Sequence, residues 1–286
     1  MKGEHSVRML CGLLGVSPSG YYRWRQKRPS KRQQEDAAIA VKIVASHKAS
    51  RGTYGAPRIL EDLREEGTRT SKRRCARLMR AEGLRGKKKN RRRPRTTDSR
   101  HAEPVATNLL SKAPEPTGPN QVWWTDVTYL KTGEGWLFLA AIIDAWSRRV
   151  VGWACAPTLH TILALAALKT ALGRRQPPQG LIHHSDRGCQ YVEAEYVALL
   201  AAAGVTRSMS RAGNCYDNAA MESFWSTFKS DTGLDEIVLA TRREAELAVF
   251  DYIETFYNPR RRHSSIGYIS PVAFENLQQR KDIKAA

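Results

Sequence analysis

Residues 121–156 read QVWWTDVTYLKTGEGWLFLAAIIDAWSRRVVGWACA, and this stretch decides the fold. It contains three runs rich in aromatic and β-branched residues, 121–132, 135–147 and 148–156, and a tight GEG turn joins the first two. Such runs with short connections are typical of sequential strands. The sequence therefore predicts an antiparallel meander of three strands.

After the meander, the pattern alternates between helices and short strands. Helical patterns cover 158–175, 193–204, 218–231 and 242–257, and short strands cover 180–188 and 205–210. This order predicts an α/β fold of the ribonuclease-H-like class, in which a mixed sheet of three antiparallel and then two parallel strands is flanked by helices.

The positive charge is concentrated in the first third of the chain. The 286 residues carry a net charge of +19, and residues 1–100 hold 28 Lys and Arg against 9 Asp and Glu. This asymmetry indicates a polyanionic partner and at least two modules. A solvated basic tail is the plainer alternative, but the helical apolar spacing in this third disfavours it. No long amphipathic basic helix or lipidation motif favours a membrane-surface role.

The cysteines are scattered and odd in number. They are Cys11, Cys75, Cys155, Cys189 and Cys215. Without a CxxC pair they argue against a disulfide framework and a zinc finger. No signal peptide or run of 18 apolar residues is visible, so we expect a cytoplasmic protein.

Residues 6–28 have the pattern helix, Gly-containing turn, helix, which is typical of a DNA-reading helix-turn-helix. Ser17 is a good N-cap and Pro18 a good first residue for the second helix. This helix mixes aromatic and basic residues, and its candidate DNA contacts are Tyr21, Tyr22, Arg23 and Arg25. An ordinary helical hairpin is the alternative.

Three more helices are predicted between residues 35 and 84, and the last begins near Ser71. One face of this last helix is a basic ridge suited to phosphates, formed by Lys72, Arg73, Arg74 and Arg77. The segment 83–95 then reads GLRGKKKNRRRPR and is too charged to pack. We expect it to be an extended arm on DNA that uses Lys87, Lys88, Lys89, Arg91, Arg92 and Arg93.

The expected domains are a helix-turn-helix at 1–30, a helical DNA-binding domain with its basic arm at 35–95, a linker at 96–119, and a catalytic core with a C-terminal helical extension at 120–286.

Three carboxylates stand out in the core. Asp126 lies in the first strand, Asp186 ends the fourth, and Glu222 lies on a helix. Spacing alone is weak evidence, because Glu195/Asp231 and Glu246/Asp282 have the same separation as Asp186/Glu222. Only Asp186 ends a strand beside a loop, where sheets of this kind carry their sites.

Each candidate has a plainer interpretation. Asp126 has apolar neighbours, so its charge must be paired, in a structural salt bridge or with a metal. Lys229 shares the Glu222 side of its helix and can hold a phosphate or be solvated. For His183 and His184, packing or substrate contact is favoured over zinc ligation. The rival acid Asp144 precedes Arg148 and Arg149, which favours an ion pair.

Magnesium explains the three carboxylates best. It takes hard oxygen ligands and keeps waters and substrate phosphates. Two Mg²⁺ (or Mn²⁺) ions can activate an attacking oxygen and stabilise a leaving one, and DNA phosphate would supply the missing ligand atoms. We therefore expect Asp126, Asp186 and Glu222 to be catalytic metal ligands in phosphoryl transfer on nucleic acid.

Five strings carry a family resemblance over nearly the whole chain: WWTDVTYL, IIDAWSRRVVGW, HHSDRGCQY, SRAGNCYDNAAMESFWSTFK and YNPRRRHSSIGYISP. With them the chain resembles a bacterial insertion-sequence transposase, in its downstream-frame catalytic protein, of the retroviral-integrase-like DDE superfamily. The stretch TYGAPRILEDLREEG with KRRCARLMRAEGLRG resembles the family's helix-turn-helix segment.

The resemblance implies a function and partners. The family's acidic triad falls on Asp126, Asp186 and Glu222, and its basic residue on Lys229. It implies binding of double-stranded element ends and target DNA, strand cleavage and transfer, a homo-multimer on DNA, and an upstream-frame protein or fusion. The location would be bacterial and nucleoid-associated. Arg260, Arg261, Arg262 and His263 would contact DNA near the site, unless they form a solvated basic turn.

Two alternatives remain open. A DNA-binding regulator with an inert core would bind ends in a salt-sensitive way without magnesium-dependent nicking. A ribonuclease-H-type enzyme would degrade RNA in hybrids, although the basic first third and the C-terminal basic segment fit it poorly.

Overall fold

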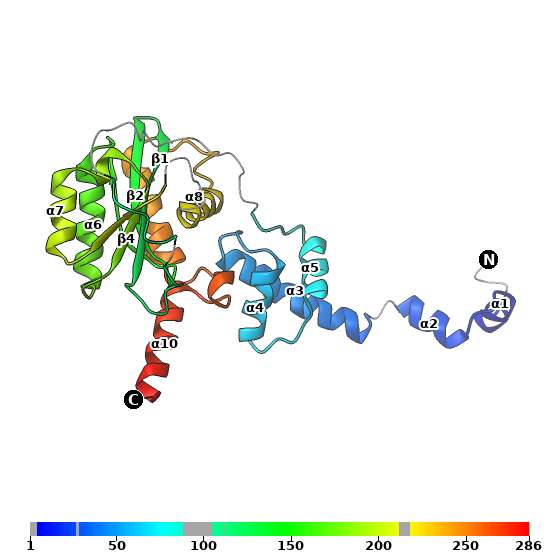
Figure 1. The fold of residues 1–286 in the computed structure, drawn as a ribbon. Coiled ribbons are helices and arrows are strands. Elements are labelled where there is room, and N and C mark those ends of the chain that lie inside the picture. The colour runs from blue at the N-terminus through cyan, green and yellow to red at the C-terminus, as the bar shows by residue number, and fades with distance from the viewer. Residues whose placement is uncertain (1–4, 27–28, 88–104, 112, 212–217, 286) are drawn as a thin grey trace. The chain divides into compact units, whose positions relative to one another are not determined.

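A computed structural model describes residues 5–26, 29–87, 105–111, 113–211 and 218–285. The chain divides into two compact units, Met1–Gly86 and Lys87–Ala286 (Figure 1). This division lies ahead of the expected linker. Across the described residues, no helix combines the length and the apolar character that crossing a membrane requires. The predicted arm residues Lys88, Lys89, Arg91, Arg92 and Arg93 lie outside the described residues.

The first unit begins with a helical hairpin. Helix α1 spans Val7–Leu13 and α2 spans Pro18–Gln26, and Gly15 turns the chain between them with φ of 63°. The Ser17 hydroxyl accepts from the Gly20 amide at 3.0 Å, which confirms the predicted cap. Only Cys11 is buried in these two helices, so the hairpin contributes little core of its own.

Three further helices enclose the core of this unit: α3 (Lys31–Ala49), α4 (Ala56–Glu65) and α5 (Lys72–Ala81). A capping box between Ser30 and Gln33 starts α3, and the Ser71 hydroxyl caps α5. The predicted apolar stripes are confirmed, because all their members are buried: Ile39, Ile43, Ile59, Leu60, Leu63, Cys75, Leu78 and Met79.

Two arginines of the predicted phosphate ridge form ion pairs with a residue of α3. Arg74 Nε lies 2.6 Å from Asp36 Oδ1, and Arg77 Nη2 lies 2.6 Å from Asp36 Oδ2. The hydrogen bonds from Arg77 and then Arg74 lower the pKa of Asp36. Both arginines thus link α5 to α3, and their contact with DNA stays a prediction. Lys72 and Arg73 are exposed.

The second unit is built on a five-stranded sheet in the order β3-β2-β1-β4-β5. The strands are β1 (Val122–Thr132), β2 (Gly135–Asp144), β3 (Val150–Ala156), β4 (Ile182–Ser185) and β5 (Thr206–Met209). The first three pair antiparallel, whereas β4 pairs parallel with β1 and with β5. The predicted mixed sheet of ribonuclease-H-like order is confirmed.

Helices cover both faces of this sheet. Figure 1 shows α6 (Thr161–Arg175) and α7 (Ala194–Ala202) on one side and α8 (Ala219–Thr232) on the other. Trp123 and Val127 of β1 lie in the core formed with α6 and α7. Gly152 allows α6 its close approach to β3, because an added Cβ would stand 2.4 Å from the Ala167 carbonyl oxygen.

The described part of the expected linker is not a free connection. Ala106 packs against the core, and its amide donates to the Met209 sulfur at 3.4 Å. The Leu109 amide donates to the Ser208 hydroxyl at 2.9 Å. Because both partners belong to β5, residues 105–111 pack beside this outer strand, and the linker expectation is corrected there.

The opposite outer strand is capped by a side chain. Helix α9 (Arg242–Phe250) continues into a π-helical segment, Asp251–Tyr257, and this run covers the predicted 242–257 helix. The next residue, buried Asn258, accepts from the Val150 amide at 2.9 Å and donates to the Val150 carbonyl at 3.0 Å. Its amide group thereby takes the place of a neighbouring strand.

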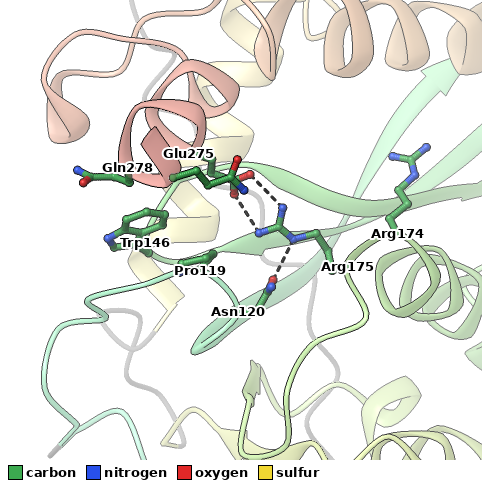
Figure 2. Close-up of a pocket in the computed structure, with 8 residues that line it drawn as sticks. Pro119, Asn120, Trp146, Arg174, Arg175, Glu275 and Gln278 are labelled. Atoms are coloured by element: carbon green, nitrogen blue, oxygen red, sulfur yellow. Dashed lines mark hydrogen bonds and ion pairs between the residues drawn. The ribbon is translucent and has the colours of Figure 1, made fainter. Parts of the chain in front are cut away.

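Helix α10 (Pro271–Ala285) is held by a buried carboxylate that the sequence analysis did not single out. Glu275 is 5% exposed and accepts from Arg149 at 2.7 Å and from Arg175 at 3.0 Å. Figure 2 shows Arg175 between Glu275 and Asn120, beside a pocket of about 250 Å³ that Trp146 also lines. Asp282 lies within α10.

A buried ion pair joins the C-terminal basic segment to α8. Asp231 accepts from Arg261 Nε and from the Tyr252 hydroxyl, and the two charged side chains are each 5% exposed. Arg262 Nη1 donates to the Tyr268 carbonyl at 2.7 Å, and the His263 ring lies against Tyr257. The expectation that Arg261 contacts DNA is wrong, because its charge is used inside the fold.

We predict that Arg261→Met lowers the free energy of unfolding by about 3–5 kcal/mol, because it leaves the Asp231 charge buried and unpaired. Denaturant titration of the full chain measures the change. The control is Arg243→Met, which removes an exposed pair with Glu246 and should cost about 0–1 kcal/mol. Equal effects of the two substitutions would contradict a structural role for the buried pair, as would an Asp231→Leu/Arg261→Met double variant no more stable than Arg261→Met alone.

Candidate active site

Two of the three predicted carboxylates are brought level by strand register. In the parallel pairing of β1 and β4, Val122 faces Ile182 and Trp124 faces His184. Asp186 lies just past the end of β4. The same register, continued by two residues, places Asp186 beside Asp126. Neighbouring strands lie about 4.8 Å apart. The two aspartates therefore belong to one edge of the sheet although 60 positions separate them.

Asp126 lies on the α8 face of the sheet. Side chains alternate along a strand, so Asp126 faces away from the core that Val127 and Trp123 form with α6 and α7. Its Oδ2 accepts from the Trp225 indole at 3.1 Å, and its Oδ1 accepts from the Val127 amide at 2.8 Å. Because α8 also carries Glu222 in its first turn, this contact ties the third carboxylate's helix to β1.

The three carboxylates influence one another electrostatically. Burial raises the pKa of Asp126 to about 8, and the nearby negative charges of Asp186 and, less strongly, Glu222 act in the same direction. The hydrogen bonds from Val127 and Trp225 lower this pKa but do not offset the other causes. A carboxylate shifted in this way favours either a proton or a cation beside it.

Local structure explains how α8 presents these groups. The helix buries Phe224 and Phe228, whose rings contact Tyr257 and Tyr252 of the π-helical segment. Gly233, with φ of 77°, ends it in a left-handed cap. The aromatic face thus fixes the helix, while Glu222 and Asp186 are only half-buried.

Lys229 also lies against β1. Its Nζ is 5.3 Å from the centre of the Tyr129 ring and 3.3 Å from Asp235 Oδ1, and its side chain is 12% exposed. The plainer interpretation of a solvated lysine is therefore corrected. In the structure Lys229, on the helix that carries Glu222, pairs with Asp235, which lies just beyond the end of that helix.

The neighbouring histidines are core residues. His183 Nε2 lies 2.7 Å from the Tyr196 hydroxyl, and burial lowers the pKa of His183 to about 3. His184 is fully buried, with its ring nitrogens 2.8 Å from the Ser208 and 3.1 Å from the Ser210 hydroxyl. These contacts agree with the favoured packing role rather than zinc ligation.

Asp144 is also structural, but not through the expected ion pair. Its oxygens accept from the backbone amides of Asn120, Trp146 and Ser147 and from the Ser147 hydroxyl. Burial raises the pKa of Asp144, and the amide hydrogen bonds counter part of this shift. The group closes the turn after β2.

The described residues contain no ready-made metal cage. Within these residues, no three His, Cys, Asp or Glu side chains are grouped so that they could hold an ion by themselves. Residues 212–217, which precede α8, lie outside this description. The pocket in Figure 2 is lined by none of the three carboxylates.

The residues predicted to contact DNA differ in their exposure and in their contacts within the protein. In α2, Tyr22, Arg23 and Arg25 are exposed and Tyr21 is half-buried, with its ring 5.5 Å from that of Tyr22. Lys87 is exposed, and its Nζ donates to the Asp231 carbonyl at 2.9 Å.

Sequence reasoning missed two residues of the site. They are Trp225 and Asp235, neither of which the sequence analysis singles out. The spacing of Trp225, three residues after Glu222, was the available signal, because residues three apart lie on one helix side.

Comparison with protein families assigns both parts of the chain. Residues 33–93 match an HTH-like domain, and residues 116–215 and 203–271 match models of an integrase core domain. The insertion element IS600 31 kDa protein of Shigella sonnei is 46% identical over 265 residues, covering 93% of this chain and 97% of that protein. Transposase InsF for insertion sequence IS3A of Escherichia coli K12 is 42% identical over 277 residues, 96% of each chain.

Among solved structures, a simian T-cell lymphotropic virus intasome has a TM-score of 0.45 at 13% identity, covering 82% of this chain and 74% of that one. The HTLV-2 integrase catalytic core domain in complex with magnesium has a TM-score of 0.43 at 17% identity, covering 56% and 98%. The sequence relatives carry the assignment, since they are similar over almost their full length. The chain therefore belongs to the family of insertion-sequence transposases that join an HTH-like domain to an integrase core.

Proposed function

We propose that this DNA transposase cleaves and joins DNA strands at Asp126, Asp186 and Glu222, with divalent metal ions as cofactor. The observation that carries the proposal is the placement of the acids: the register of β1 with β4 sets Asp186 beside Asp126, and Trp225, on the helix that carries Glu222, donates to Asp126. Carboxylates that repel one another lower the stability of the fold, and a cation relieves that repulsion.

The residues present fit magnesium or manganese. Both take carboxylate oxygens, and magnesium uses few protein ligands because it keeps waters and substrate phosphates. An incomplete donor set, with no closed cage among the described residues, suits ions completed by DNA. Two such ions, when bound, would activate the attacking oxygen and stabilise the leaving one.

Each residue of the chain then has a role. Asp126 and Asp186 would hold the cofactor between β1 and β4, and Glu222 would complete the site from α8. Lys229 would bind the DNA backbone beside it, after exchanging Asp235 for a phosphate. Water would be the nucleophile for nicking and a DNA 3′-hydroxyl the nucleophile for joining.

DNA binding falls mainly to the basic first third. The exposed residues Lys72 and Arg73 of α5 and Arg23 and Arg25 of α2 would contact the element ends through phosphates. We further infer a homo-multimer, because joining requires two ends and a target to be held together. An upstream-frame protein or fusion remains part of this proposal.

We predict that Glu222→Gln abolishes magnesium-dependent cleavage and leaves binding of the element ends unchanged, because the change removes a charge and keeps the side chain's shape. Labelled terminal DNA measures both steps. Glu246→Gln on α9, which alters an exposed ion pair, serves as the control. Wild-type cleavage by Glu222→Gln would remove this residue from the site.

We predict that, without divalent ions, the contribution of Asp126 to the stability of the wild type falls as pH rises from about 4 to about 8. The folded pKa of Asp126 is raised to about 8 from 3.8, so the folded state holds a proton that the unfolded chain has released. Asp126→Asn should lack this part of the fall and become relatively more stable toward pH 8. Thermal unfolding at several pH values measures it.

In the same experiment, magnesium should stabilise the wild type at high pH and leave Asp126→Asn nearly unaffected. Parallel pH profiles of the two proteins without metal would refute the coupling of Asp126 to the other carboxylates.

We predict that Lys72→Ala with Arg73→Ala weakens binding to all DNA sequences and reduces the slope of log affinity against log salt by about 1 per residue. Arg74→Ala should instead lower thermal stability, because it breaks the contact with Asp36. Titrations at several salt concentrations separate the two effects. An unchanged salt slope in the double variant would exclude α5 from the phosphate contacts.

A further inference from the structure

We propose that Trp225 is a positioning residue that orients the Asp126 carboxylate toward its cofactor and fixes the distance between Asp126 and the Glu222 helix. This inference rests on the proposed function, since it assumes that Asp126 binds metal. It adds to the three carboxylates an aromatic residue whose indole N–H, rather than its bulk, serves the site.

The hydrogen bonds on Asp126 fix the plane of its carboxylate. The Trp225 indole donates to Oδ2 at 3.1 Å, and the Val127 amide donates to Oδ1 at 2.8 Å. One donor comes from a helix and the other from the strand itself, so rotation of the group would break at least one bond. An ionised carboxylate has about four acceptor positions, so a lone pair remains on each oxygen for a metal ion.

The indole itself is held in place. Trp225 is 7% exposed, and its ring lies 4.7 Å from that of Phe224 and 6.1 Å from that of Phe228. A buried indole N–H requires an acceptor, and Asp126 Oδ2 provides it. The aromatic cluster thus fixes the donor, and the donor fixes the carboxylate.

The same bond sets the position of Glu222. Trp225 and Glu222 lie three residues apart on α8 and therefore share one side of the helix. Lys229, one turn further, contacts the Tyr129 ring on β1. Two contacts from α8 to β1 thus hold the helix in register with the strand. Loss of the indole bond would let Asp126 turn and weaken the link between the two carboxylates.

Hydrogen bonds to metal-binding carboxylates commonly change metal affinity by about 10–100-fold. The test is Trp225→Phe, which keeps an aromatic ring and removes the N–H. The matched control is Trp153→Phe, because Trp153 donates the same kind of bond, 2.9 Å to Glu254. Binding of Mn²⁺ to the full chain without DNA, followed by electron paramagnetic resonance, gives a readout independent of catalysis.

We expect Trp225→Phe to weaken Mn²⁺ binding about tenfold and to lower the cleavage rate, with end binding unchanged. Trp153→Phe should keep wild-type Mn²⁺ affinity while losing comparable thermal stability. Benzothienylalanine at position 225, which replaces the N–H by sulfur and keeps the ring size, should reproduce Trp225→Phe. This second variant separates the lost hydrogen bond from any packing defect.

Wild-type Mn²⁺ affinity in both variants at position 225 would overturn the inference, as would equal weakening in Trp153→Phe. Asp126→Asn distinguishes this outcome from failure of the proposed function. If Asp126→Asn abolishes Mn²⁺ binding and the Trp225 variants do not weaken it, only the positioning role fails. If Asp126→Asn also binds Mn²⁺ normally, the proposed metal site itself is wrong.

Discussion

The parallel register between β1 and β4 is the constraint on which the core depends. Once Trp124 faces His184, the chain that leaves β4 must pass Asp126, and the next acidic side chain is Asp186. The antiparallel pairing of β1 with β2 keeps β1 in the interior of the sheet, and β4 pairs with its first residues on the other side. A slip of one residue would turn Asp126 into the core with α6 and α7.

Placing acidic groups close together lowers the stability of the fold. Contacts in the residues that surround these groups offset this loss. Phe224 and Phe228 anchor α8 to the π-helical segment, while Asp231 and Arg261 join its last turn to the C-terminal segment. Rigid surroundings keep mutually repelling side chains from separating, so the site is organised before a ligand arrives. Arg261 of the C-terminal segment therefore holds α8 in place.

The sequence predicted those features that depend on local pattern. Runs of aromatic and β-branched residues predicted the strands. The spacing of Ile59 and Leu63 predicted a buried helix face, which the structure confirms. The acid at the end of a strand identified Asp186. Each of these signals lies within a few residues.

The rest depends on which side chains meet across the fold, and no short window contains that information. Arg74 and Arg77 resembled a ridge for phosphates, yet both donate to Asp36, which lies 38 and 41 positions away in sequence. Glu275 reaches Arg149 across 126 positions. A basic residue looks the same in a sequence whether it faces DNA or an internal acid, so a sequence alone does not separate the two roles.

The capping of β3 by Asn258 bears on how copies of this chain associate. An open strand edge can recruit a strand from another molecule, and this is how sheets aggregate. The Asn258 side-chain amide accepts from the Val150 N–H and donates to the Val150 carbonyl. A strand from another molecule therefore cannot pair with the sheet at this position. A core shortened to end before Asn258 would uncover that peptide, and its tendency to self-associate would then reflect the cut rather than the native assembly.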